Sequence, residues 1–375
     1  MKKLLIKAPL VLALALALAP SLVSCDDEKS TPSNPDAPTL TRGAFILNEG
    51  IGIPAEGSLD IIDFDNATID NDVFAVANGR SIGENPQCGI SYGSKIYVGL
   101  AGSKAIEIID RATYKSIARI NLADSESGSQ PRSMVAQKGQ VYISMYDGFV
   151  CRLDTVAQQI KESIYVGRCP ETMAIRGTEL YVPKSGGEEY KENPESSATV
   201  ISLLNFTVLR HLDNLPLNPV RILTSGNKLF LLAKGDDTTV KPRLYEMSEL
   251  GETKPLAKAT LACADSHDIY FVYAPTSYIP EEGDTPDDRD LVCRYSKYNV
   301  ASGKTTGWGI ARVDYPSAVE VDPISGKFLV ASYAKSGLNP DYNSAGYVNE
   351  YNSDYSLVKT YGIGLGRPSI FFIND

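Results

Sequence analysis

The stretch Pro86–Leu100 reads PQCGISYGSKIYVGL, and it shows the pattern on which the whole fold depends. A proline-led apolar run is followed by a turn at Tyr92–Lys95 and by the triplet Ile96–Val98. Two more short runs follow, Ala105–Asp110 and Ser116–Ile120. Short apolar or alternating runs separated by glycine-containing and polar turns indicate β-strands. The segment therefore predicts a unit of four consecutive antiparallel strands.

The same unit recurs along the chain. Apolar–aromatic or apolar triplets like Ile96–Val98 return in the second strands Val141–Ile143, Leu180–Val182, Leu229–Leu232, Ile269–Val272 and Phe328–Val330. The openings of the units are marked by Pro86, Pro131, Pro170, Pro219, Pro316 and Pro368, whereas the sixth unit is expected to open at His267-Asp268. These prolines are about 40–50 residues apart, with one interval of double length, and that period is typical of β-propeller blades.

The two ends of the repeat region each hold part of a blade. Ala44–Leu47 has the pattern of a second strand, with Leu59–Asp63 and Asp72–Ala75 expected as the third and fourth strands. Pro368–Ile373 has the pattern of a first strand with nothing after it. Joining the two fragments removes two exposed sheet edges. We therefore predict an all-β fold, a seven-bladed β-propeller of four-stranded antiparallel blades, closed by pairing of the C-terminal strand with the N-terminal strands.

The N-terminal residues are predicted to be a targeting signal and not part of the fold. Residues 1–24 have a lysine-rich start and a short apolar core, and Leu22–Cys25 resembles a bacterial lipobox, so Cys25 is the predicted lipidation site. An ordinary secretory signal with an incidental cysteine is the alternative. Residues 25–42 are polar and proline-containing, which predicts a flexible tether, and residues 43–375 form the single propeller domain. The acidic run Asp26–Glu28 resembles the surface-export signal of Bacteroidetes lipoproteins, which predicts a lipid-anchored protein of the outer membrane facing the cell exterior.

Composition excludes several function classes. The formal net charge of -10 disfavours nucleic acid as a partner. With two histidines, no C-x-x-C pair and no phosphate-binding motif, the sequence predicts no metal, no cofactor, no catalytic residue and no enzymatic activity. Five cysteines follow Cys25, and they are Cys88, Cys151, Cys169, Cys263 and Cys293. They are expected to be buried thiols, and pairing of Cys263 with Cys293 is the alternative.

Candidate ligand contacts follow from propeller topology. The loops that enter a first strand and the loops that follow a second strand lie on one face of the ring, where polar and aromatic side chains of several blades converge. The candidates are Asn48, Glu49, Asn85, Gln87, Arg132, Tyr146, Asp147, Lys184, Arg221, Lys234, Asp236, His267, Tyr273, Tyr333 and Arg367. The alternative is that such residues only cap strands and bind water.

Insertions should rise from the same face as these candidates. They span residues 51–57, 186–198, 275–290 and 336–346, and the three longer ones carry Tyr190, Tyr278 and Tyr342. All four follow second strands, so we predict a recognition rim around the candidate residues.

Several segments resemble a known family. Gly43–Gly50, Tyr92–Val98, Gln130–Arg132, Tyr146–Gly148, Val166–Glu171 and Val321–Gly326 are similar to segments of the YncE-like propeller lipoproteins of Bacteroidetes, over Gly43 to Ile373. That family includes the vitamin B12-capturing surface lipoproteins (BtuG). The resemblance implies a ligand-binding protein that captures cobalamin, or another corrinoid, and delivers it to a TonB-dependent outer-membrane transporter. Two other hypotheses remain: a protein-interaction lid or scaffold without a small ligand, and a propeller lyase or hydrolase.

Overall fold

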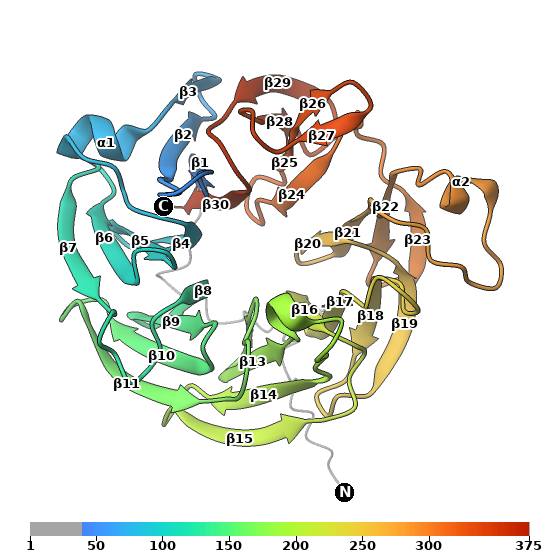
Figure 1. Ribbon diagram of the computed structural model, residues 1–375, viewed down its shortest axis with the longest axis horizontal. Helices are drawn as coiled ribbons and strands as arrows, with labels where there is room; N and C mark the ends of the chain where they lie inside the picture. The colour runs from blue at the N-terminus through green and yellow to red at the C-terminus, as the bar shows by residue number, and fades with distance from the viewer. Residues whose placement is uncertain (1–39, 375) are drawn as a thin grey trace, which may run out of the picture. The chain divides into compact units, whose positions relative to one another are not determined.

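The computed structural model describes residues 40–374, which fold into seven four-stranded antiparallel sheets arranged as the blades of a ring (Figure 1). From the inner to the outer strand, blade 1 is β30 (Pro368–Asn374), β1 (Thr41–Asn48), β2 (Ser58–Asp63) and β3 (Thr68–Asp70); blade 2 is β4 (Pro86–Tyr92), β5 (Lys95–Leu100), β6 (Ala105–Asp110) and β7 (Ser116–Asn121); blade 3 is β8 (Pro131–Gln137), β9 (Gln140–Met145), β10 (Phe149–Asp154) and β11 (Gln159–Tyr165).

The remaining blades follow the same order. Blade 4 is β12 (Ala174–Arg176), β13 (Glu179–Lys184), β14 (Ser197–Ser202) and β15 (Thr207–Leu212); blade 5 is β16 (Pro219–Ser225), β17 (Lys228–Ala233), β18 (Arg243–Met247) and β19 (Thr253–Lys258); blade 6 is β20 (Leu261–Ala264), β21 (Asp268–Tyr273), β22 (Arg294–Asn299) and β23 (Lys304–Gly307); blade 7 is β24 (Pro316–Val321), β25 (Phe328–Ser332), β28 (Tyr347–Tyr351) and β29 (Leu357–Gly362). The predicted fold class is confirmed.

The ring closes as the two chain ends predict. β30 pairs with β1 in an antiparallel register that sets Phe45 opposite Phe371 and Ile46 opposite Ile370. The rings of Phe45 and Phe371 lie 5.4 Å apart. Blade 1 is thus built from residues more than 300 positions apart in sequence, and β1 is paired on both of its edges, with β2 and with β30.

The hydrophobic core lies between neighbouring blades. Phe45 and Phe371 of blade 1 share one cluster with Val98 of blade 2, and Tyr270 of blade 6 shares another with Phe328 of blade 7. The second strands are therefore apolar on both faces, because each blade is covered on two sides. The outer strands face solvent and alternate in exposure, as β7 does.

One predicted strand is a helix. Residues 72–75 were expected to form the outer strand of blade 1, but that strand is β3, and α1 (Val73–Asn78) follows it. The Asp72 side chain accepts a hydrogen bond from the backbone N–H of Ala75, which caps the helix. Phe74 is fully buried in the core cluster that contains Phe45. The predicted strand at 72–75 is therefore wrong, because this segment is helical and not extended.

The opening of blade 6 was also misplaced. Its first strand is β20, and His267 lies in the turn between β20 and β21, with Asp268 as the first residue of β21. The Asp265 carboxylate accepts backbone N–H bonds from His267 and Asp268, at 2.8 Å each. Turns between first and second strands lie on the opposite face from the loops that enter first strands, so His267 is not on the predicted ligand face.

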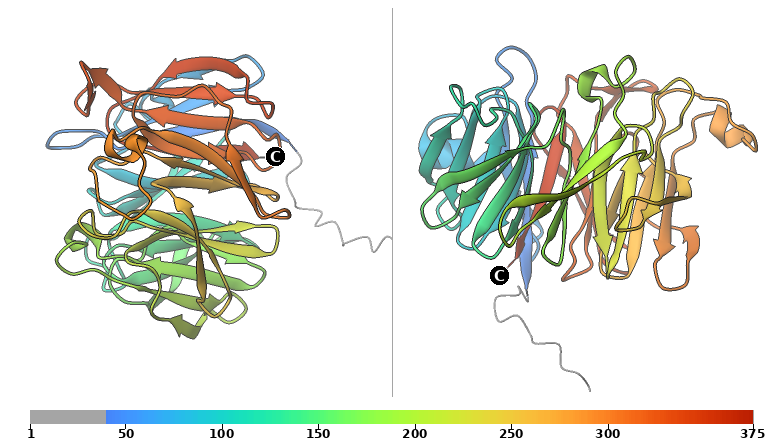
Figure 2. Two further views of the ribbon diagram at one scale, coloured as in Figure 1. Left: turned by 90° about the vertical axis from the view of Figure 1, so that its right-hand side faces the viewer. Right: turned by 90° about the horizontal axis from the view of Figure 1, so that it is seen from below.

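The insertions carry the remaining structural elements. The one in blade 4 contains η1 (Gly187–Glu189), the one in blade 6 contains α2 (Pro286–Arg289), and the one in blade 7 forms the hairpin β26 (Ala334–Ser336) and β27 (Asn339–Asp341). Figure 2 shows the β26–β27 hairpin and the β1–β2 loop projecting on the same side of the ring. Two of the four predicted insertions thus project on one side of the ring, and their role in recognition stays a prediction.

Several predictions concern residues that lie wholly or largely outside those described. The signal peptide 1–24 and the lipidated Cys25 are among them, as is most of the tether, although β1 already begins at Thr41. Within residues 40–374 no helix is long and apolar enough to cross a membrane. The five cysteines of this part of the chain are all free, so Cys263 and Cys293 do not pair.

Candidate functional site

A cavity of about 740 Å³ occupies the mouth of the central channel on the insertion-bearing face. All seven blades contribute to its lining, from Glu49 in blade 1 to Tyr333 in blade 7. A second cavity of about 320 Å³ continues along the inner strands and shares Gln87, Arg132 and Arg367 with the first. A concave site of this volume with convergent polar groups is typical of small-molecule binding.

Most of the sequence-predicted contacts line the larger cavity. They are Glu49, Asn85, Gln87, Arg132, Tyr146, Lys234, Tyr273, Tyr333 and Arg367. They come from two kinds of loop, those entering the inner strands and those following the second strands. Propeller topology brings these two sets together because alternate loops of an antiparallel blade share one end of the sheet.

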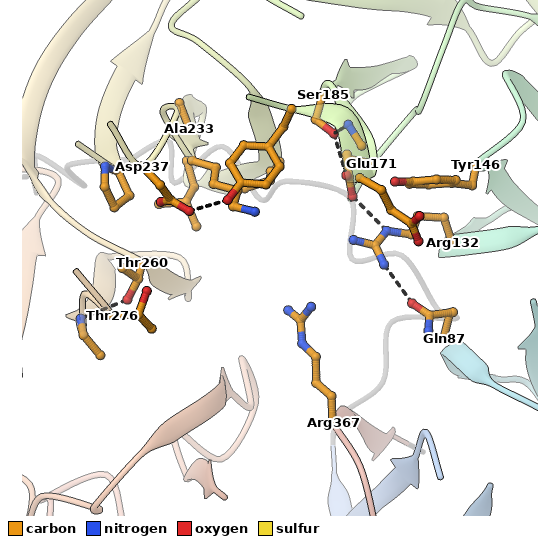
Figure 3. Close-up of a pocket in the computed structure, with 18 of the residues that line it drawn as sticks. Gln87, Arg132, Tyr146, Glu171, Ser185, Ala233, Asp237, Thr260, Thr276 and Arg367 are labelled. Carbon is orange, nitrogen blue, oxygen red and sulfur yellow. Dashed lines mark hydrogen bonds and ion pairs between the residues drawn. The ribbon is translucent and has the colours of Figure 1, made fainter. Parts of the chain in front are cut away.

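One wall of the cavity is a chain of hydrogen bonds across blades 1 to 4, part of which Figure 3 shows. The Arg132 guanidinium donates from Nη1 to Gln87 Oε1 at 2.7 Å and from Nε to Glu171 Oε2 at 2.8 Å. Ser185 Oγ donates to the other oxygen of Glu171 at 2.7 Å. Gln87 Nε2 donates to Glu49 Oε1 at 2.5 Å. These contacts fix the polar atoms before any ligand arrives.

Charge and burial raise the pKa values of Arg132 and Tyr146 in this wall. Burial works to lower the pKa of Arg132, but the neighbouring Glu171 carboxylate outweighs it and raises that pKa. The Arg132 guanidinium also lies over the Tyr146 ring, 5.7 Å from its centroid. Burial, with Cys169 and Glu171 close by, raises the pKa of Tyr146 to about 12. Tyr146 therefore presents a neutral hydroxyl beside an ionised Arg132–Glu171 pair.

The opposite wall carries Tyr190, Lys234 and Asp237. Lys234 Nζ lies 3.2 Å from the centroid of the Tyr190 ring, and the Tyr190 hydroxyl donates to the Asp237 carboxylate. Burial, reinforced by that hydrogen bond, raises the pKa of Tyr190 to about 12. Burial lowers the pKa of Lys234 below its ordinary value. This wall offers a cation held over an aromatic face.

The floor and the remaining side of the cavity hold Tyr273, Tyr333, Thr260 and Arg367. Burial raises the pKa of both tyrosines, which stay neutral at physiological pH. Thr260 Oγ1 accepts a hydrogen bond from the backbone N–H of Ala274 at 3.0 Å. Figure 3 shows the Arg367 side chain pointing into the open centre, without a dashed contact to the other residues drawn.

Three predicted residues are structural instead. Asn48 is buried, and its Nδ2 donates to Asp60 at 2.7 Å. The Asp147 carboxylate accepts from the backbone N–H and the hydroxyl of Ser129, at 2.8 and 2.9 Å. Asp236 accepts from the backbone N–H groups that follow it in its own loop, which include those of Thr239 and Val240. These short polar side chains satisfy loop backbone groups, as Asp and Asn commonly do.

Three further predicted residues do not line the larger cavity. Arg221 lies in the channel below it and is paired with Glu320 of blade 7 at 2.8 Å. Lys184 ends β13 beside Gly167, away from the cavity lining. His267 is the clear error, because it lies in a turn on the other face.

Sequence reasoning missed Thr260, Asp237 and Ile279, which line the cavity. Thr260 immediately precedes β20, so it was lost when the opening of blade 6 was assigned to His267-Asp268. Ile279 belongs to an insertion whose position was predicted but whose path was not. No group of three or more potential metal ligands occurs among residues 40–374.

The comparisons with known proteins extend the fold assignment. No family model matches the chain, and no curated protein sequence matches it. Among solved structures it is similar to hydrazine synthase of Kuenenia stuttgartiensis, with a TM-score of 0.57 and 15% identity over 75% of this chain and 87% of that one. It is also similar to a hypothetical selenium-binding protein from Sulfolobus tokodaii, with a TM-score of 0.64 and 10% identity over 88% and 93% of the two chains. At these identities the likeness shows a shared propeller fold.

Proposed function

We propose that this protein is a ligand-binding propeller that captures a small polar molecule in the cavity at the mouth of its channel. The observation that carries the proposal is the cavity itself, about 740 Å³ in volume and lined from all seven blades. Its polar walls are fixed by hydrogen bonds between blades, such as those of Arg132 with Gln87 and Glu171. Preorganised groups favour binding because little conformational entropy is lost when the ligand arrives.

The ligand that we propose is a corrinoid such as cobalamin, delivered to a TonB-dependent outer-membrane transporter. This choice rests on the resemblance of Gln130–Arg132 and Tyr146–Gly148 to the vitamin B12-capturing family, and Arg132 and Tyr146 line the cavity. A planar ring with amide arms suits tyrosine faces together with amide and guanidinium donors. The lipobox at Leu22–Cys25 supports a surface anchor for such a capture protein.

Calorimetric titration of the mature protein with cyanocobalamin tests this function. We expect saturable heat at micromolar protein, and we expect Tyr146→Ala and Arg132→Gln to weaken binding about tenfold or more, because each removes a cavity-lining contact. His267→Ala, on the other face, is the matched control and should bind like the wild type. Absence of heat with the wild-type protein would refute the corrinoid proposal.

A second candidate function is a protein-interaction lid or scaffold. It is favoured by exposed apolar side chains on the insertions: Ile53 is fully exposed, and Leu338 and Tyr342 of the β26–β27 segment are 89% and 53% exposed. Apolar groups on projecting loops are typical of protein contacts. Co-purification of a transporter that depends on Ile53 and Leu338, without binding of any small molecule, would select this function.

We also propose that the site has no catalytic role. The two histidines lie outside the cavity lining, and two of its four carboxylates, those of Glu171 and Asp237, are already engaged by Arg132 and Tyr190. Turnover of a polysaccharide or lactone substrate that is abolished by Glu171→Gln would overturn this view.

A further inference from the structure

Two cations face the cavity without a carboxylate partner. Lys234, which follows β17, and Arg367, which precedes β30, make no ion pair within the described part of the chain, and neither side chain is shown to donate a hydrogen bond there. Arg132, the third basic residue of the lining, is paired with Glu171 at 2.8 Å. The cavity therefore contains two positive groups without a carboxylate in ion-pairing contact, although Asp237 and Glu171 lie near enough to favour the charged form of Lys234.

Three of the four acids that line the cavity already contact other groups, and the fourth is Glu188. Glu171 accepts from both Arg132 and Ser185. Asp237 accepts from the Tyr190 hydroxyl and lies 3.9 Å from Lys191. Glu49 accepts from Gln87 at 2.5 Å. Glu49 and Asp237 each use one carboxylate oxygen in these contacts, and none of these three acids makes an ion pair with Lys234 or Arg367.

The backbone holds the two cations in place. The carbonyl of Arg367 accepts the backbone N–H of Glu49 at 3.2 Å, which ties the loop before β30 to the loop after β1. Lys234 donates its backbone N–H to Asn218 at 2.8 Å, and its ammonium rests over the Tyr190 ring. These backbone contacts fix both residues beside the cavity.

Burial and the nearby charges act on the pKa of Lys234 in different directions. The pKa of Lys234 is lowered first by burial, and the positive charges of Lys191 and Arg367 lower it further. Asp237 and Glu171 act in the other direction, and the pKa still lies below its ordinary value of 10.5. An anion between Lys234 and Arg367 would favour the charged form of Lys234 against the effect of burial and supply the acceptor that the guanidinium lacks.

We propose that Lys234 and Arg367 form an anion subsite, which binds a carboxylate, phosphate or sulfate group of the captured ligand. Arg367 supplies a planar fork suited to two oxygens of one oxyanion, and Lys234 supplies a point charge from the opposite wall. The proposal deepens the small-molecule function proposed above and rests on it. It assigns the ligand class as polar molecules with an oxyanion group, of which a phosphate-containing corrinoid is one example.

Inorganic sulfate is the probe of choice, because its charge stays constant through the range in which Lys234 titrates. Binding is measured as the rise in melting temperature with sulfate, at constant ionic strength in chloride. Lys234→Gln and Arg367→Gln should each weaken sulfate binding about tenfold, the loss expected for one charge-assisted contact. The Lys234→Gln/Arg367→Gln double variant measures the non-specific rise in melting temperature that sulfate causes by its exclusion from the protein surface. This rise is subtracted from the values of the other proteins. Lys254→Gln, an exposed outer-strand lysine of blade 5, makes the same charge change and should leave binding unchanged.

The pH dependence provides a second readout. Sulfate binding by the wild type should weaken as the pH rises through the pKa of Lys234, at a lower pH than an ordinary lysine would give. Lys234→Arg should bind sulfate at high pH as well, because arginine stays charged. Equal sulfate stabilisation of the wild type and the double variant would overturn the subsite. Cyanocobalamin binding that persists in that case leaves the proposed function standing, whereas sulfate binding without cyanocobalamin binding supports the subsite and refutes the corrinoid.

Discussion

Truncation of the chain after Arg367 tests how the ring is closed. The deletion removes β30, which places Ile370, Phe371 and Ile373 in the core, each 8% exposed. Burial of each side chain contributes roughly 1.5–3 kcal/mol, or about 4.5–9 kcal/mol together. The free energy of unfolding of a whole domain is typically about 5–15 kcal/mol. We therefore expect the truncated protein to unfold at ambient temperature or to aggregate through the uncovered edge of β1.

A point variant separates loss of packing from loss of the strand. Phe371→Ala should lower the free energy of unfolding by about 3–5 kcal/mol, because it leaves a cavity beside Phe45. Leu357→Ala removes a side chain that is 48% exposed on the outer strand β29, and should change stability by no more than about 0.5 kcal/mol. Urea unfolding followed by circular dichroism measures both. If the truncated protein melts like the full-length chain, the closing blade is not formed by the two ends.

Three further predictions concern the site, the rim and the thiols. Glu171→Gln should destabilise the protein by about 1.5–3 kcal/mol, measured by urea unfolding, because it weakens charged hydrogen bonds from Arg132 and Ser185; an unchanged midpoint would contradict the proposed wall. Hydrogen bonds from Arg294 to Asp288, and from Lys241 and Lys258 to Asp284, hold the pKa of both carboxyls well below the usual range. Folding lowers these pKa values, so the contacts of Asp284 and Asp288 stabilise the blade 6 insertion fully above about pH 4 and weaken as the pH falls further. Hydrogen exchange of residues 280–290 should therefore rise in acid before that of β21. Simultaneous exchange of both segments would contradict this prediction. Burial raises the pKa of Cys88 and Cys151 to about 12, so a thiol reagent at pH 8 should label neither in the native protein, although both should react after unfolding.

The fold was predictable because its signal is repeated. Each blade contributes a second strand that is apolar on both faces, so an error in one unit is corrected by its neighbours. The opening of blade 6 shows this. The sequence pattern places it at His267-Asp268 and not at β20, and it still predicts seven blades. Residues 72–75 show the limit, because the three apolar residues Val73–Ala75 do not distinguish a strand from the first turn of α1.

The site was only partly predictable. Topology alone places Gln87, Arg132 and Tyr146 at the mouth of the channel, because alternate loops share one face. Topology does not say which polar side chain turns inward and which satisfies its own loop. Asp147 and Asp236 were equal candidates by position, and both accept backbone N–H groups instead. Such choices depend on hydrogen-bond geometry over distances that a sequence pattern does not encode.

Closure of the ring and formation of the site depend on the same segment. Arg367 stands immediately before Pro368, which pairs with Asn48 at the end of β1, and the Arg367 carbonyl accepts the N–H of Glu49. The pairing of β30 with β1 therefore sets the position of Arg367 relative to Glu49, Gln87 and the rest of the cavity. A variant that loosens this strand, such as Phe371→Ala, should weaken sulfate binding at the subsite as well as stability. A destabilising change of equal size in a blade that holds neither Lys234 nor Arg367, such as Ile143→Ala in blade 3, should leave sulfate binding by the folded protein intact.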